Sequence, residues 1–119
     1  MKKLAKREEE LMQVLWDLEK AFVKEIIERL PEPKPHYNTV STIIRILKDK
    51  GFVGHESFGN SHRYYPKVSK DEYQQKAVND VLKNYFDNSY PKMVAYFAKK
   101  EKINEDELED IIRLIKNKK

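Results

Sequence analysis

The chain has 119 residues, about the length of one domain, so we expect no second large domain. It contains no cysteine, which excludes disulfides, thiolate metal sites and cysteine nucleophiles. Charged residues make up 37% of the chain and the net charge is +4. Leu, Ile, Val and Phe together number 31 of the 119 residues, or about 26%. This share is above the ~20% below which disorder is expected. We therefore expect a folded protein with a thin core that a partner helps to complete.

The positive charge is concentrated in the middle of the chain. Residues 34–70 contain seven Lys and Arg against only Asp49 and Glu56, whereas residues 71–119 are balanced. A local excess of this kind suits a polyanion, although a solvated basic face explains the charge alone equally well. The longest apolar run, Met93 to Ala98, is far short of the ~18 residues that a membrane span needs. We expect a cytoplasmic protein with no membrane insertion.

Two amphipathic helices are predicted in the first 30 residues. Apolar residues recur near the helical period over residues 4–18 and again over residues 22–30. The proline-rich stretch 31–35 then stops the second helix, because proline lacks an amide and disfavours helix in the residue before it. A turn between two helices follows from this pattern.

A third helix is predicted to begin at Asn38, a suitable N-cap residue, and to end before Gly51, which can adopt the left-handed conformation. Its apolar residues recur at helical spacing from Val40 to Leu47 and form one continuous face. The opposite face presents short hydrogen-bonding groups first and cations further along. Its members are Asn38, Ser41, Thr42, Arg45, Lys48 and Asp49.

From Phe52 the apolar period changes from about 3.6 to 2. Residues 52–57 and 62–65 are predicted strands, and Gly59 and Asn60 between them tolerate a positive φ. Three helices followed by a two-stranded hairpin are the plan of a winged helix-turn-helix domain, which we assign to residues 1–68. The fold class predicted is mainly α with this small β-hairpin.

Residues 69–119 are predicted to form three more helices. Ser69 with Glu72 and Asn104 with Glu107 have the spacing of helix caps, and another helix opens at Ser89. Their apolar stripes have no evident core of their own, so a second copy of the chain is the simplest partner, the alternative being that they pack back on residues 1–66. The residues predicted to form a dimer interface are Tyr73, Ala77, Val81, Tyr85, Val94, Phe97, Leu108, Ile111, Ile112 and Ile115.

The third helix and the hairpin together predict a DNA-binding surface. A helix about 10–12 Å across fits the major groove, where Ser, Thr, Asn and Arg side chains bond to base edges, while other cations contact phosphates. The predicted DNA-binding residues are Asn38, Thr39, Ser41, Thr42, Arg45, Lys48, Lys50, His62 and Arg63. The alternative is a winged-helix protein–protein interaction module without sequence-specific DNA binding, in which Ile46 and the hairpin bind a protein.

The sequence contains no motif that indicates an enzymatic reaction. The sequence contains no glycine-rich phosphate loop and no H-E-x-x-H motif, and its three histidines, His36, His55 and His62, have no acid cluster near them. We expect no catalytic residues, no metal and no cofactor.

Three segments resemble the penicillinase repressor family of bacterial transcription regulators, the BlaI/MecI/CopY type. They are residues 6–16 (KREEELMQVLW), residues 38–53 (NTVSTIIRILKDKGFV) and residues 63–66 (RYYP). The likeness extends over nearly the whole chain. It implies a homodimer that binds a palindromic DNA operator through two winged helices and blocks transcription, with residues 69–119 as the dimerisation region.

The resemblance also implies two modes of induction. In the β-lactam-responsive branch, a membrane-bound sensor with a cytoplasmic metalloprotease leads to cleavage in the dimerisation region, and the matching bond here is Tyr96–Phe97. Family members commonly have Asn before this Phe, so Tyr96 is a departure. The copper-responsive branch uses a C-terminal cysteine cluster, which this chain lacks.

Overall fold

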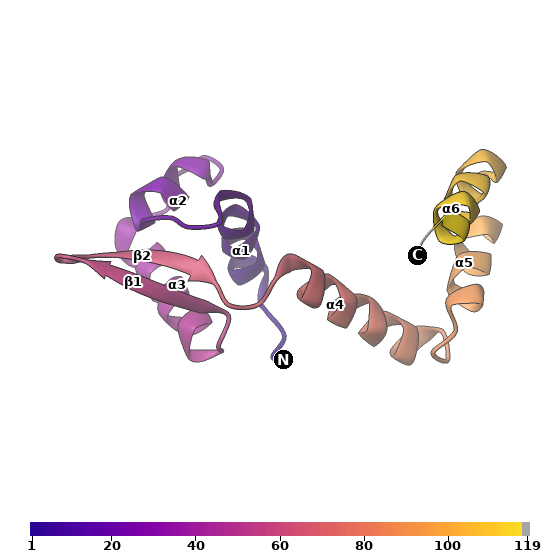
Figure 1. Ribbon diagram of the computed structural model, residues 1–119, viewed down its shortest axis with the longest axis horizontal. Helices are drawn as coiled ribbons and strands as arrows, with labels where there is room; N and C mark the ends of the chain where they lie inside the picture. The colour runs from indigo at the N-terminus through magenta and orange to yellow at the C-terminus, as the bar shows by residue number, and fades with distance from the viewer. Residues whose placement is uncertain (118–119) are drawn as a thin grey trace. The chain divides into compact units, whose positions relative to one another are not determined.

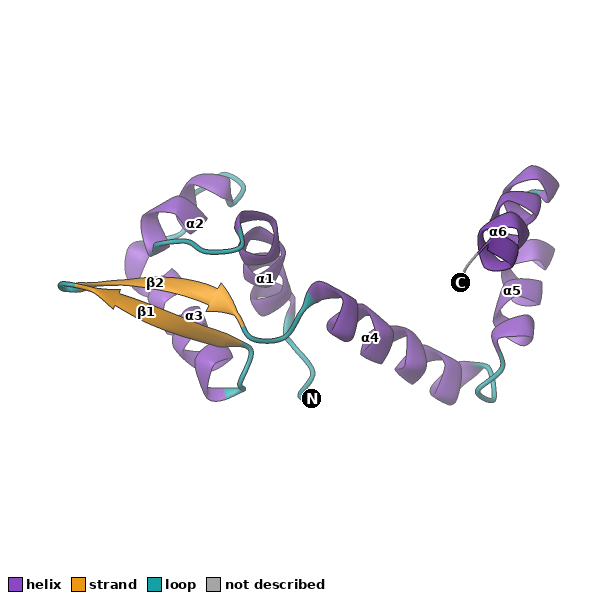
Figure 2. Cartoon of the chain, in the orientation of Figure 1, coloured by secondary structure: helices purple, strands orange, loops and turns teal. Residues whose placement is uncertain are grey.

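The computed structural model describes residues 1–117, apart from the side chain of Ile115. It is mainly helical with one two-stranded antiparallel sheet, as predicted (Figure 1; Figure 2). The elements are α1 (Lys6–Leu18), α2 (Val23–Arg29), α3 (Tyr37–Asp49), β1 (Val53–Phe58), β2 (Ser61–Pro66), α4 (Lys70–Tyr85), α5 (Tyr90–Lys99) and α6 (Glu105–Asn117). They form two compact units, Met1–Lys76 and Ala77–Lys119.

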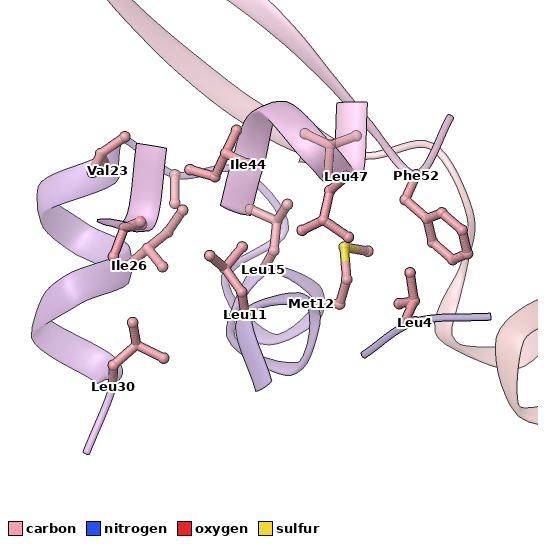
Figure 3. Close-up of a cluster of buried hydrophobic side chains, with 13 residues drawn as sticks. Leu4, Leu11, Met12, Leu15, Val23, Ile26, Leu30, Ile44, Leu47 and Phe52 are labelled. Atoms are coloured by element: carbon pink, nitrogen blue, oxygen red, sulfur yellow. The ribbon is translucent and has the colours of Figure 1, made fainter. Parts of the chain in front are cut away.

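The core of the first unit lies where α1, α2 and α3 bury their apolar faces. Figure 3 shows Ile44 and Leu47 of α3 over Leu11 and Leu15 of α1, with the side chains of α2 closing one side. All four of these residues are buried. Because each such side chain contributes about 1.5–3 kcal/mol when it leaves water, this cluster fixes which side of α3 faces inward.

The starts of α1 and α2 depend on glutamates in their first turns. The carboxylate of Glu8 accepts a hydrogen bond from the Ala5 amide at 3.1 Å, and that of Glu25 accepts one from the Phe22 amide at 2.8 Å. The N-cap residues themselves are apolar and offer no side-chain acceptor. Each helix therefore uses only the reach-back half of the usual capping arrangement.

The prediction that Asn38 caps α3 is wrong. The N-cap residue is His36, whose side chain makes no capping hydrogen bond, and Asn38 lies inside the first helical turn. The backbone leaves the proline-rich segment in an extended conformation at His36, with φ −67° and ψ 149°, and turns helical directly afterwards. The path of the chain therefore puts the N-cap position of α3 two residues before Asn38, the residue best suited to occupy it.

The hairpin is a regular pair of strands with a two-residue loop. Val53 pairs with Pro66 and Phe58 with Ser61, so the first strand is shifted by one residue from its predicted bounds and the second is longer by one residue at each end. Gly59 opens the loop with a φ of 61°, a conformation that costs glycine little. Backbone hydrogen bonds of 2.9 and 2.7 Å between Ala21 and Tyr64 fasten β2 to the segment before α2. We call this hairpin the wing.

The first unit includes the beginning of α4. The ring of Tyr73 lies 5.8 Å from those of both Trp16 and Phe52, and its hydroxyl donates to Glu9. The indole of Trp16 donates to the carbonyl of Val68 at 2.9 Å. The compact unit accordingly ends at Lys76, within α4, whereas the sequence placed the end of the domain at residue 68.

The second unit has helix boundaries close to those predicted and a small interior. Ser89 with Lys92 and Asn104 with Glu107 make the expected capping hydrogen bonds, as Ser69 with Glu72 does at the start of α4 in the first unit. Among its described residues, Leu82 alone is buried, at 3% exposed. Aromatic rings of α5 gather around Phe86, with that of Tyr96 at 5.6 Å.

Candidate nucleic-acid interface

Helix α3 has one buried face and one exposed polar face. Val40 and Leu47 are fully buried, whereas Asn38, Thr42 and Arg45 are exposed. Thr39 and Ser41 are half-buried at the edge between the two faces. The polar side chains expected to contact base edges are therefore on the surface of the unit.

Thr42 and Arg45 offer complementary hydrogen-bonding chemistry. The hydroxyl of Thr42 donates to the backbone carbonyl of Asn38 at 2.9 Å, so its oxygen is left to accept from an amino group. Among residues 1–117, Arg45 forms no ion pair, and its guanidinium donors are available to a guanine or a phosphate. Neighbouring positions on α3 can thus present an acceptor and several donors.

Lys50 has partners within its own unit. Its ammonium lies 2.6 Å from a carboxylate oxygen of Glu8 and 3.3 Å from the carbonyl of Lys3. The hydrogen bond from Lys50 is the main cause that lowers the pKa of Glu8. Both members of the pair are largely covered, so the predicted phosphate contact of Lys50 stays a prediction that competes with this internal partner.

Arg63 likewise has partners within the wing. Its guanidinium is 3.4 Å from Glu56 and lies over the ring of Phe58 at 5.0 Å. Glu56 also accepts a hydrogen bond of 2.9 Å from Lys20, which is the main cause that lowers the pKa of Glu56. Because side chains alternate along a strand, Arg63 lies on the face of the wing opposite to that of His62, so the predicted pair of wing cations is divided between two faces.

A groove of about 450 Å³ lies between the tip of the wing and the starts of α2 and α3. Its polar lining places His62 beside groups outside the predicted DNA-binding set. The residues lining it are Phe22, Val23, Lys24, Glu25, Tyr37, Asn60, Ser61, His62 and Tyr64. Besides His62, the position of Asn60 in a predicted turn pointed to this surface beforehand. Lys24 and Tyr37 did not, because they reach it from helices whose angle the sequence does not give.

The predicted dimer-interface residues are divided between the two compact units. Tyr73 packs within the first unit, as described above. In the second unit Val94 and Leu108 are half-buried. The others with described side chains are exposed: Ala77, Val81, Tyr85, Phe97, Ile111 and Ile112. The side chain of Ile115 lies outside the described residues.

The candidate cleavage bond lies within a helix. Tyr96 and Phe97 are in the second half of α5, with 48% and 36% of their surfaces exposed. Their rings are 5.5 Å apart, and both face Phe86. Their backbone is therefore helical rather than extended.

Residues 1–117 contain neither a membrane-spanning helix nor a cluster of metal-binding side chains. No helix within residues 1–117 combines the length and apolar character needed to cross a bilayer. The same part of the chain holds no group of three or more His, Asp or Glu side chains arranged to bind a metal ion.

The fold and the exposed polar face of α3, with the wing beside it, define a winged-helix DNA-binding protein. The family model described as "Penicillinase repressor" matches residues 4–117. The chain belongs to the penicillinase repressor family, which is a family of repressors and not of enzymes.

Individual relatives agree with this assignment. The chain is 27% identical to the methicillin resistance regulatory protein MecI of Staphylococcus aureus strain N315 over 117 residues, which cover 98% of this chain and 94% of that protein. It is 22% identical over 103 residues to a penicillinase repressor of Staphylococcus aureus, covering 86% and 82% of the two chains. It also resembles the solution structure of the DNA binding domain of the repressor BlaI, with a TM-score of 0.53 and 27% identity over 61% of this chain and 94% of that one.

Proposed function

We propose that this protein is a homodimeric transcriptional repressor of the bacterial cytoplasm that binds a palindromic operator. In this proposal α3 enters the major groove and the wing contacts the DNA backbone. The observation that supports it most is the division of α3 into a buried apolar face and an exposed face with Asn38, Thr42 and Arg45. Membership of a repressor family favours DNA binding over the alternative of a protein–protein interaction module.

Arg45 provides the test of sequence-specific binding. Replacing it by Ala should weaken binding to a duplex of the protein's own promoter region by about 1–3 kcal/mol for each half-site, or roughly 5- to 150-fold each, because a bidentate base contact is lost in each protomer. Arg29→Ala, which removes an exposed arginine at the end of α2, is the matched control and should bind like the wild type. Gel-shift titrations at one moderate salt concentration measure both variants. Equal wild-type affinity for promoter and random duplexes would refute sequence-specific recognition.

The homodimer is proposed to form through the exposed apolar side chains of the second unit. Isolated domains seldom leave this many apolar groups uncovered, and a symmetric interface covers them in both copies. Ile112 is 49% exposed, and replacing it by Glu would place a charge in this interface. Sedimentation equilibrium should then show that Ile112→Glu is a monomer at concentrations where the wild type is a dimer. Asp110→Ala, two residues earlier and on another side of α6, should leave the dimer intact. A monomeric wild type would refute this part of the proposal.

The proposed route of induction is cleavage of Tyr96–Phe97 through a membrane sensor-protease pathway. Because this bond lies inside α5, cleavage requires that helix to open locally. Cells challenged with a β-lactam should then contain a fragment that ends at Tyr96, detected by mass spectrometry. An intact repressor in cells that have induced the regulated genes would refute this route.

A further inference from the structure

Two histidines on one face of the wing are unusually close. The ring centroids of His55 and His62 are 4.4 Å apart, with the rings at 89° to each other. The register explains the contact: His55 pairs with Tyr64 and His62 with Ser57, so the two histidines are diagonal neighbours on the same face. The ring of Tyr64 lies about equally far from both, at 5.9 and 6.2 Å.

The charged groups around this pair are mainly cationic. The positive charge of Lys48 in α3 lowers the pKa of His55. Lys24 and Glu25 of α2 line the same groove as His62. The carboxylate of Glu25 already accepts the hydrogen bond from the amide of Phe22. The acid of the wing, Glu56, is on the opposite face. Among residues 1–117, no carboxylate forms an ion pair or hydrogen bond with either imidazole.

This arrangement disfavours a charged imidazole in the free protein. Burial first, and then the positive charges of Lys48 and His62, lower the pKa of His55. Burial raises the pKa of Tyr64, so its phenol is neutral at pH values where histidine titrates and supplies no negative charge. An external anion beside the rings would oppose this effect on His55.

We propose that His55 and His62 together bind one phosphodiester of the DNA backbone and that the pair takes up a proton as it does so. The inference rests on the proposed DNA binding and names a contact, His55, that neither the charge pattern nor the groove selected. The hydroxyl of Ser57 lies 3.5 Å from Nδ1 of His62, so Nε2 of that ring stays available to donate to a phosphate oxygen. A phosphate beside the rings favours their charged form, as any close anion does.

Proton uptake makes the affinity depend on pH in a defined direction. Because the bound state holds more protons than the free state, binding strengthens as pH falls through the range in which histidine titrates. For one proton shared by the pair, we expect DNA to bind about three- to fivefold more tightly at pH 6.0 than at pH 7.5.

The experiment is a fluorescence-anisotropy titration of a random-sequence 30-bp duplex at low salt, at pH 6.0 and pH 7.5. A random duplex serves because a phosphate contact is independent of sequence, so the result does not depend on whether an operator is recognised. The wild type should gain affinity at pH 6.0, and the double variant His55→Gln, His62→Gln should lose most of that gain. His36→Gln, which replaces the exposed histidine before α3, is the control and should keep it.

Each outcome decides the proposal. A double variant that keeps the wild-type pH dependence, or a His36→Gln variant that loses it, overturns the assignment to the wing. Circular dichroism confirms that the variants are folded. In a second measurement, NMR titration of the imidazole resonances should give a higher pKa for His55 or His62 with the duplex than without it, and unchanged values would overturn the proposal. Failure of promoter-specific binding would instead refute the proposed repressor function and leave these measurements interpretable.

Discussion

Two lysines near the end of α3 show how closely spaced residues acquire different roles. Lys48 is exposed and acts on His55 of the wing, whereas Lys50, at the helix end, contacts Glu8 and the carbonyl of Lys3. Side chains two positions apart on a helix point in different directions, so the same residue type meets solvent at one position and the interior at the other. The net charge of the segment does not distinguish these two environments.

Replacing Lys50 by Met should therefore affect folding more than binding. The loss of a largely covered, charge-assisted hydrogen bond to Glu8 should lower the free energy of unfolding by about 1.5–3 kcal/mol. Lys48→Met is the matched substitution and should leave stability within about 0.5 kcal/mol while weakening DNA binding. Urea denaturation and gel-shift titration of both variants test the contrast, and equal effects on stability would contradict it.

The lowered pKa of Glu8 leads us to expect that the free energy of unfolding depends on pH in the acid range. Its folded-state pKa lies below the ordinary value of 4.5, so its contribution to stability is complete above that pH and is lost as pH falls through the lower, folded-state value. The wild type should consequently lose more free energy of unfolding between about pH 5 and pH 3 than Glu8→Gln does. Urea denaturation at the two pH values measures the difference, and identical losses would contradict the role of Glu8.

At the scale of the elements, the first turn of α4 functions as part of the winged helix. Its cap, formed by Ser69 and Glu72, positions Tyr73 against Trp16 and Phe52. A helix that was predicted for a partner's surface thus begins by covering the core of its own unit. These aromatic contacts lie within that unit, which ends three residues later at Lys76.

Tyr73→Phe separates the hydrogen bond from the packing of the ring. Losing the bond to Glu9 should cost about 0.5–1.5 kcal/mol at neutral pH. Burial, reinforced by Glu9, raises the pKa of Tyr73 to about 12, whereas the unfolded chain releases this proton near 10. The wild type should thus lose more stability than Tyr73→Phe does as pH rises from about 8 to 11. Fluorescence of Trp16 during urea unfolding reports both effects, and parallel pH profiles would contradict the assignment.

At the scale of the whole molecule, the division into two compact units leads us to expect that folding of the DNA-binding part and dimerisation can be separated. A fragment of residues 1–76 should fold alone and should be more stable than residues 1–68, because the longer fragment includes the contacts of Tyr73. It should bind promoter DNA at least tenfold more weakly than the full chain, since joining two binding modules strengthens binding by roughly 100-fold or more. Thermal unfolding and gel shifts test the two expectations. Equal stability of the fragments, or equal affinity of fragment and full chain, would contradict the corresponding one.

The amino-acid sequence alone was sufficient for the order of the elements and for the inward face of α3. Periodic apolar residues such as Val40, Ile44 and Leu47 have few ways to leave water, and the caps at Ser69 and Asn104 are satisfied within four residues. These are local properties, and a local pattern determines them.

Only the tertiary structure decided which polar groups are available for binding. Lys50 and Arg63 were predicted as DNA contacts because of their charge. The packing of α3 against α1 brings Lys50 to Glu8, and the strand pairing of the wing brings Arg63 to Glu56. The strand register brings His55 to His62, and a shift of one residue would place them on opposite faces. Such contacts join residues distant in the chain or across strands, so they depend on angles and registers that only the packed fold determines.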